Sequence, residues 1–183
     1  MQINFIHKFD LIFILPMNKF KYNNINYILY DLIPIEWQLI LMNDGSFTQN
    51  LNSLTGQEIK VKIISKHNNK VYNNNYYLRE VLLKDYEDNN LAFAQSSWSI
   101  NNYIFKDILI HKRKPIGQSL IELKVDIYKD IHEIYYGYSK YLNTLFSING
   151  PIWGRKYTIY YNKKPLTTIQ EFFSPRIINF FNQ

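Results

Sequence analysis

The sequence predicts an α+β fold, in which one domain has an antiparallel β-sheet flanked by helices. Two observations support this prediction. Long runs of β-branched and aromatic residues recur along the chain, and short polar stretches rich in Asn, Asp and Gly separate them. Short apolar segments with capping residues at their ends lie before and between these runs, which is typical of helices that cover a sheet.

Four short helices are expected. The first follows Pro34, whose fixed backbone angle suits a first helical turn. The second, over residues 47–54, follows a turn rich in Asn, Asp, Gly and Ser. The third spans residues 118–122. Ser139 can cap a fourth that continues through Phe146, because its hydroxyl can accept a free N–H at the helix start.

Charged residues interrupt two of the predicted strands. In one of them Arg79, Val81 and Leu83 share a face and Glu80 lies on the other, because successive side chains of a strand alternate. Glu171 lies near the end of a C-terminal hairpin that turns at residues 162–164. The predicted strands lie at residues 57–64, 76–84, 91–99 and 128–138, and the hairpin covers residues 150–175.

The composition excludes several classes of protein. The chain has no Cys, which rules out disulfide frameworks, thiolate zinc sites and cysteine nucleophiles. Its 183 residues carry a net charge of +6, but the basic residues are scattered apart from a cluster at His111–Lys114. Nucleic-acid-binding proteins concentrate arginine and aromatic residues on one face. We therefore expect no nucleic acid partner, although a basic binding module that uses this cluster stays an alternative.

Residues 1–22 are interpreted as an N-terminal extension and residues 23–183 as the domain. The apolar run at residues 11–15 is much shorter than the roughly 20 residues that span a bilayer, and Pro16 ends it. Asp10 and the lack of a small-residue cleavage site argue against a signal peptide. The run is instead expected to dock on the domain as a strand or helix, or to be poorly tied to it. No membrane partner is expected.

The common nucleotide-binding and hydrolase motifs are absent, and the four histidines form no pair with metal-ligand spacing. The remaining constellation is Arg79 in one apolar strand and Glu171 in another. A buried charge is costly without a partner, so each needs one. Two interpretations stay open. Arg79 pairs with Glu80 or Glu171 as structural glue, or it holds a substrate carboxylate with its planar guanidinium while Glu171 accepts a hydroxyl hydrogen bond.

Four sequence blocks, in order, cover roughly residues 42–176. They are Asp44-Gly45-Ser46-Phe47-Thr48, Tyr77-Leu78-Arg79-Glu80-Val81-Leu82-Leu83, Lys114-Pro115-Ile116-Gly117, and the series Trp153-Gly154-Arg155, Lys164-Pro165-Leu166 and Glu171-Phe172 with Pro175. With them the chain resembles the chorismate lyase (chorismate pyruvate-lyase) family, especially its divergent plastid and cyanobacterial branch. The blocks are similar to that family's early apolar segment, L-R-E strand, x-P-L-G turn, and W-G-R, K-P-L and E-hydrophobic-P series.

The resemblance implies a carbon–oxygen lyase that converts chorismate to 4-hydroxybenzoate and pyruvate, for prenylquinone synthesis in the plastid stroma. It implies a closed site that uses no cofactor or metal, with chorismate as the small-molecule partner. Arg79 and Glu171 would be the catalytic pair: Arg79 binds a carboxylate, and Glu171 hydrogen-bonds the oxygen para to it. Phe47 would cover the ligand, and the backbone of Ile116 and Gly117 would contact it.

Three positions depart from the bacterial members. Gln95 and Gln118 stand where those members have arginines, and the interval from Pro165 to Glu171 is one residue longer. Arg155 is expected to be structural, in a W-G-R turn at the start of the hairpin. The alternative function is a non-catalytic sensor of aromatic carboxylates with the same fold, since fold does not determine function. The first ~40 residues are too short for the winged-helix domain that usually precedes such sensors. The sequence indicates no oligomeric state.

Overall fold

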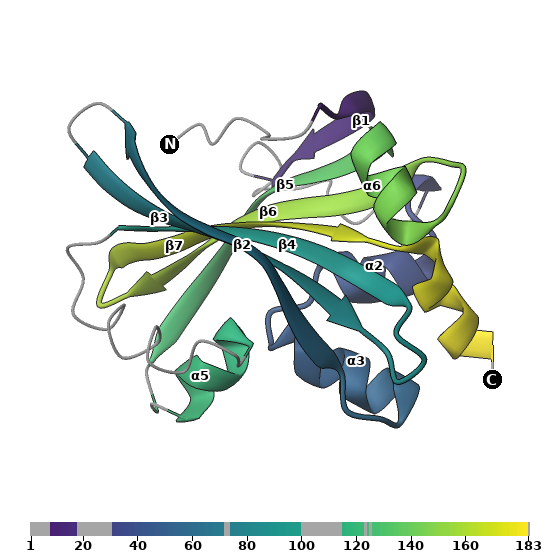
Figure 1. Ribbon diagram of the computed structural model, residues 1–183, viewed down its shortest axis with the longest axis horizontal. Helices are drawn as coiled ribbons and strands as arrows, with labels where there is room; N and C mark the ends of the chain where they lie inside the picture. Colours follow the sequence, from purple (N-terminus) through teal and green to yellow (C-terminus); the bar gives the residue numbers. More distant parts are fainter. Residues whose placement is uncertain are drawn as a thin grey trace.

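The structure, a computed structural model, describes residues 8–17, 31–71, 74–99, 115–122, 124 and 126–182. These residues form one seven-stranded antiparallel sheet with helices on both sides (Figure 1). The predicted fold class is confirmed. The strands are β1 (Asp10–Pro16), β2 (Lys60–Val71), β3 (Asn74–Lys84), β4 (Asn90–Ser99), β5 (Ile127–Tyr138), β6 (Ile152–Tyr161) and β7 (Lys164–Phe173). The helices are α2 (Ile35–Leu41), α3 (Phe47–Thr55), α5 (Ile116–Glu122), α6 (Lys140–Phe146) and the 3-10 helix η2 (Pro175–Asn182).

The sheet consists of two three-stranded meanders joined edge to edge. The strand order is β1-β5-β6-β7-β4-β3-β2, so β2-β3-β4 and β5-β6-β7 each follow the chain, and β4 pairs with β7 between them. Strand β1 extends the far edge by pairing with β5. This arrangement brings residues from the two halves of the chain onto one face of a continuous sheet.

Local backbone and capping chemistry accounts for two helix ends and one turn. Ser139 accepts a hydrogen bond from the Leu142 amide at the start of α6. Gly56 ends α3 with φ of 65°, a left-handed conformation that suits a residue without Cβ. Asn162 and Lys163 both have positive φ and connect β6 to β7 through a two-residue turn, one residue shorter than predicted. Helix η2 was not anticipated.

The N-terminal apolar run forms a strand, one of the alternatives that the sequence left open. Strand β1 pairs with β5 from Asp10↔Tyr138 to Pro16↔Glu133, so this part of the predicted extension belongs to the sheet. The division at residues 22 and 23 stays a prediction, and the basic cluster at residues 111–114 lies outside the described residues. Within the described ranges, no helix is long and apolar enough to cross a membrane.

Three apolar clusters hold the sheet and helices together. The largest packs α2, α3 and η2 against one end of the sheet and includes Trp37, Trp153 and Phe173. A second, around Leu120 and Ile159, lies on the same face under α5. The third packs α6 on the opposite face. Figure 1 shows α3 and α5 on one side of the sheet and α6 on the other. The space between the first two clusters is not filled, and it forms the candidate site.

Candidate functional site

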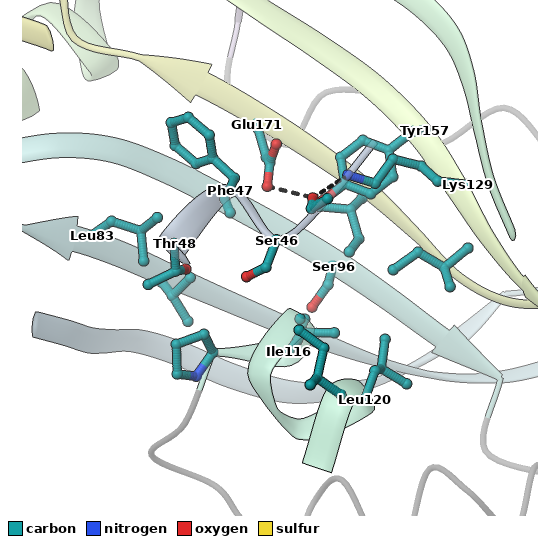
Figure 2. A pocket seen from close by; sticks show the side chains of 18 of the residues that line it. Ser46, Phe47, Thr48, Leu83, Ser96, Ile116, Leu120, Lys129, Tyr157 and Glu171 are labelled. Carbon is teal, nitrogen blue, oxygen red and sulfur yellow. Dashed lines mark hydrogen bonds between the residues drawn. The ribbon is translucent and has the colours of Figure 1, made fainter. Parts of the chain in front are cut away.

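A cavity of about 290 Å³ lies between the sheet and helices α3 and α5. Its volume is near the lower end of the range for small-molecule sites. Its walls are mostly aliphatic, with a few polar side chains that converge from several strands (Figure 2). All five residues predicted to form the site line this cavity: Phe47, Arg79, Ile116, Gly117 and Glu171.

The carboxylate of Glu171 is fixed from two sides. Nε and Nη2 of Arg155 each lie 2.8 Å from Oε2 of Glu171, and the Tyr157 hydroxyl donates to Oε1 at 2.9 Å. All three side chains are buried. Burial raises the pKa of Tyr157 well above its ordinary value, and the nearby charge of Glu171 raises it further. Tyr157 therefore stays a neutral hydrogen-bond donor to Glu171.

The structure corrects the expected location of Arg155 but does not contradict its expected structural role. The triplet Trp153-Gly154-Arg155 lies within strand β6 and not in a turn. A Cβ on Gly154 would lie 2.6 Å from Cδ1 of Phe172 and 2.8 Å from the carbonyl oxygen of Glu171, so only glycine permits the close approach of β6 and β7 here. Arg155 is fully buried, directly opposite Glu171. It is therefore the partner of Glu171, a role that one of the two interpretations gave to Arg79.

A β-bulge sets this pairing. Tyr160 pairs with Pro165 and Ile159 with Thr167, which leaves Leu166 as one additional residue in β7. A register set by the turn alone would place Gln170 opposite Arg155, and the side chain of Glu171 would point to the other face. The bulge shifts β7 by one residue and turns Glu171 into the cavity. It also accommodates an interval before Glu171 that is one residue longer.

Arg79 lies on a different wall of the cavity, on β3. It is buried, and this burial lowers the pKa of its guanidinium from the ordinary value, while Tyr77 opposes the shift. In the sheet register Arg79 opposes Ser96, whereas Glu171 opposes Ala94, the inward residue two positions away on β4. Strand and residue spacings then separate the Cα atoms of Arg79 and Glu171 by about 12 Å. The two charges approach the cavity from different sides.

The predicted alternation in β3 is confirmed. Glu80 lies on the opposite face of the sheet from Arg79, where it accepts hydrogen bonds from Ser65 at 2.5 Å and Gln95 at 3.3 Å. Gln95 therefore points away from the cavity. On the cavity side, β4 contributes Ala94 and Ser96.

Lys129 is a cavity residue that the sequence reasoning missed. Its Nζ donates to the carbonyl oxygens of Gly45, at 2.8 Å, and Asn43, at 3.2 Å. It also lies 4.7 Å from the centroid of the Tyr157 ring. Figure 2 shows Lys129 and Tyr157 beside each other at the end of the site that holds Glu171. A sequence signal was present, since Lys129 lies between Ile127 and Ile131 at alternating positions of one strand.

The loop before α3 and the start of α5 close the cavity. Phe47 packs on Phe173 with ring centroids 4.8 Å apart, and Ser46 lies against α5. A Cβ added to Gly117 would lie 2.7 Å from the Ser46 Oγ and 3.0 Å from its Cβ. Gly117 therefore permits the contact between α5 and this loop.

Replacing Gly117 with alanine is expected to destabilise the protein by about 1–3 kcal/mol, because the new methyl group overlaps Ser46 and pushes α5 from the loop. Urea unfolding measures this change. The matched control is Gly117→Ala combined with Ser46→Gly, which removes the atoms that clash. A double variant as unstable as Gly117→Ala would contradict this explanation.

No group of three or more His, Asp or Glu residues within the described ranges is arranged to hold a metal ion. The titratable and charged side chains that line the cavity are Asp44, Arg79, Lys129, Tyr157 and Glu171. They can bind anionic and hydroxyl groups, and they can orient a ligand that carries both.

The fold and the cavity define a class of protein in which one antiparallel sheet and its covering helices enclose a cavity. Two solved structures share the fold, each with a TM-score of 0.52. One is the ligand-binding domain of a Bordetella bronchiseptica protein assigned to the GntR family of transcriptional regulators; it is 10% identical and covers 63% of this chain and 85% of its own. The other is a Staphylococcus aureus gene product that is 15% identical; the match covers 74% of this chain and 92% of the gene product. At these identities the likeness concerns the fold alone.

The chain belongs to the Rv2949c-like chorismate pyruvate-lyase family, whose model matches residues 41–181. The family predicted from the four sequence blocks is therefore confirmed. Among its relatives is the uncharacterised ycf21 protein of Antithamnion sp., 42% identical over 98% of both chains. Another is the uncharacterised ycf21 protein of Cyanophora paradoxa, 36% identical over 80% of both. The matched ycf21 proteins of red algae and Cyanophora are encoded in plastid genomes.

Proposed function

We propose that the protein is a chorismate pyruvate-lyase of the plastid stroma, which forms 4-hydroxybenzoate and pyruvate for prenylquinone synthesis. The observation that carries the proposal is the pair of opposed groups in a mostly apolar cavity. Arg79 on one wall suits the ring carboxylate, and the fixed carboxylate of Glu171 suits a hydroxyl para to it. The family assignment supports the same chemistry.

In the proposed reaction the ether bond between the ring and the enolpyruvyl group breaks. The ring loses the proton from the carbon that bears its hydroxyl group and becomes aromatic. The departing enolpyruvate takes up one proton and becomes pyruvate. No water, oxidant or reductant is consumed. Since aromatisation drives this step, the protein mainly needs to hold the substrate in a reactive geometry and to stabilise the charge that develops.

Glu171 has the hydrogen-bonding capacity for its proposed role. A carboxylate can accept about four hydrogen bonds. Nε of Arg155 donates to Oε2, Nη2 of Arg155 lies within ion-pair distance of the same oxygen, and Tyr157 donates once to Oε1, so Oε1 retains one site for a ligand hydroxyl. Because the carboxylate is already oriented, a bound ring would not have to order it. Arg79 would act as the carboxylate anchor, and Phe47 and Ile116 would exclude water from the ring.

A non-catalytic binding domain for aromatic carboxylates is the alternative. The observation in its favour is the fold shared with a domain described as ligand-binding. Such a protein would use the same cavity and the same anchor, Arg79, but would leave its ligand unchanged.

An assay with chorismate separates the two functions. The purified protein, without added metal or nucleotide, is expected to release pyruvate and 4-hydroxybenzoate in equal amounts. Arg79→Ala serves as the control, with release at the spontaneous rate expected. A folded protein that binds 4-hydroxybenzoate but produces nothing above the spontaneous rate would contradict the lyase and favour the binding domain.

A further inference from the structure

Lys129 occupies the end of the cavity near Glu171, and the proposed lyase reaction does not yet use it. The side chain comes from β5 and is half-buried. Two of its three N–H groups donate to the carbonyl oxygens of Asn43 and Gly45. Among the described residues, none accepts the third. An ammonium group at a cavity wall with a remaining donor can bind an anion there.

At the end of the cavity near Glu171, Lys129 carries the positive charge that neighbouring groups do not neutralise. Glu171 is neutralised by Arg155, which holds it in a buried ion pair. Asp44 also lines the cavity, but it is exposed, and water screens its charge. At the other side, Arg79 shares the cavity wall with Val81, Leu83 and Ser96. The cavity therefore has two cationic walls, on β3 and β5, with three strands of the sheet between them.

We infer that Lys129 is a specificity-determining residue, which binds the second carboxylate of a dianionic ligand whose ring carboxylate is held by Arg79. This inference rests on the proposed function, because it takes the same cavity as the ligand site. The second carboxylate belongs to the ether side chain on the ring carbon next to the hydroxyl that Glu171 binds. After the side chain leaves, the aromatic product has one carboxylate. Lys129 therefore favours the substrate over the aromatic product.

The titration of Lys129 supports this assignment and gives it a signature. Burial, and to a smaller extent the charge of Arg155, lower the pKa of Lys129 to about 8, although Glu171 and Asp44 oppose the shift. Tyr157, which also faces Lys129, has a raised pKa and stays neutral. A bound carboxylate would raise the pKa of Lys129 again. The contribution of protonated Lys129 to the binding of the second carboxylate is therefore complete below pH 8 and decreases as the pH rises above 8.

Two stable aromatic compounds test the inference by equilibrium binding, without catalysis. The first, 3-(carboxymethoxy)-4-hydroxybenzoate, carries both carboxylates. The second, 3-methoxy-4-hydroxybenzoate, has the same ring and ether but lacks the second carboxylate. At pH 7 the wild-type protein is expected to bind the dicarboxylate about tenfold more tightly than the monocarboxylate, as a partly exposed charge-assisted hydrogen bond would provide.

The variant Lys129→Gln is expected to bind both compounds within twofold of each other, and its affinity for the monocarboxylate should match that of the wild type within about twofold. Lys140→Gln is the matched control. It makes the same change of charge at an exposed position of α6, away from the cavity, and should keep the tenfold preference.

The pH dependence provides a second test that needs no loss of the ammonium group. Between pH 7 and 9.5 the ratio of the wild type's affinities for the two compounds should fall to about one. The phenol hydroxyl that both compounds share also titrates toward the upper end of this range, so the ratio of the two affinities, and not either affinity alone, is the readout. Lys129→Arg should retain the preference at both pH values, because a guanidinium group does not titrate in this range. The pH comparison of the wild type with Lys129→Arg still tests the inference if Lys129→Gln fails to fold.

Equal affinity of the wild type for the two compounds would overturn the inference, and so would an unchanged preference in Lys129→Gln or a preference that persists at pH 9.5. These outcomes differ from a failure of the proposed function. A protein that shows the predicted selectivity but releases no pyruvate from chorismate keeps this inference and loses the lyase activity. If the wild type turns over chorismate but Lys129→Gln keeps the preference for the dicarboxylate, the lyase activity stands and the inference about Lys129 fails.

Discussion

Replacing Arg155 with methionine is expected to destabilise the protein by about 3–5 kcal/mol, the usual cost of removing one partner of a buried ion pair. Two losses contribute. Among the described residues, the carboxylate of Glu171 keeps only Tyr157 as a hydrogen-bond partner. In addition, Nη1 of Arg155 donates to the carbonyl oxygens of Ile40, Leu41 and Asn43. The first two would remain buried without this donor, whereas Asn43 keeps the donor Lys129. Urea unfolding of the purified variant measures the change.

A double variant tests whether the pair itself causes the loss. Combining Arg155→Met with Glu171→Gln removes the isolated charge, and the double variant is expected to recover part of the lost stability. The recovery should be incomplete because the carbonyl groups of Ile40 and Leu41 at the end of α2 still lack the donor that Arg155 supplied. A loss below about 1 kcal/mol for Arg155→Met would show that the pair contributes little.

Replacing Arg79 with alanine is expected to weaken the binding of 4-hydroxybenzoate by about 2–4 kcal/mol, or roughly 30- to 700-fold in Kd. The reason is that the ligand carboxylate would enter a mostly apolar cavity without its guanidinium partner. Isothermal titration calorimetry at pH 7 measures the affinity. Lys129 is not expected to replace Arg79, since it lies on β5, across the cavity from β3.

Two variants serve as comparisons for Arg79→Ala. Arg79→Lys keeps the charge but not the planar fork, so it is expected to recover only part of the affinity. Lys62→Ala removes a cation from the exposed side of the neighbouring strand β2 and should leave the affinity unchanged. If Arg79→Ala folds and binds 4-hydroxybenzoate as tightly as the wild type, Arg79 has a structural role only.

Local patterns in the sequence predict much of this fold. The alternation in residues 76–84 assigns Arg79 and Glu80 to opposite faces, and the structure has them there. The capping residue Ser139 predicts a helix start because its hydroxyl acts on a neighbouring backbone N–H group. These features depend on contacts between residues that are close in the chain.

The partners within the site could not be predicted in the same way. The pairing of Arg155 with Glu171 depends on a bulge at Leu166, and no local sequence pattern marked this residue as unpaired. Lys129 reaches the cavity because β5 lies beside β6, and its acceptors come from a loop more than 80 residues earlier in the chain. Such contacts follow from tertiary packing, which overrides local preference.

The pairing of β4 with β7 has a consequence for how the chain folds. Each meander can form from neighbouring segments, but the junction between them requires two strands from distant parts of the chain to meet. Closing so long a loop is slow, so the junction is expected to form late in folding. Arg79 belongs to one meander and Glu171 to the other. A molecule that contacts both residues therefore binds only the fully assembled chain, and it shifts the folding equilibrium toward that state.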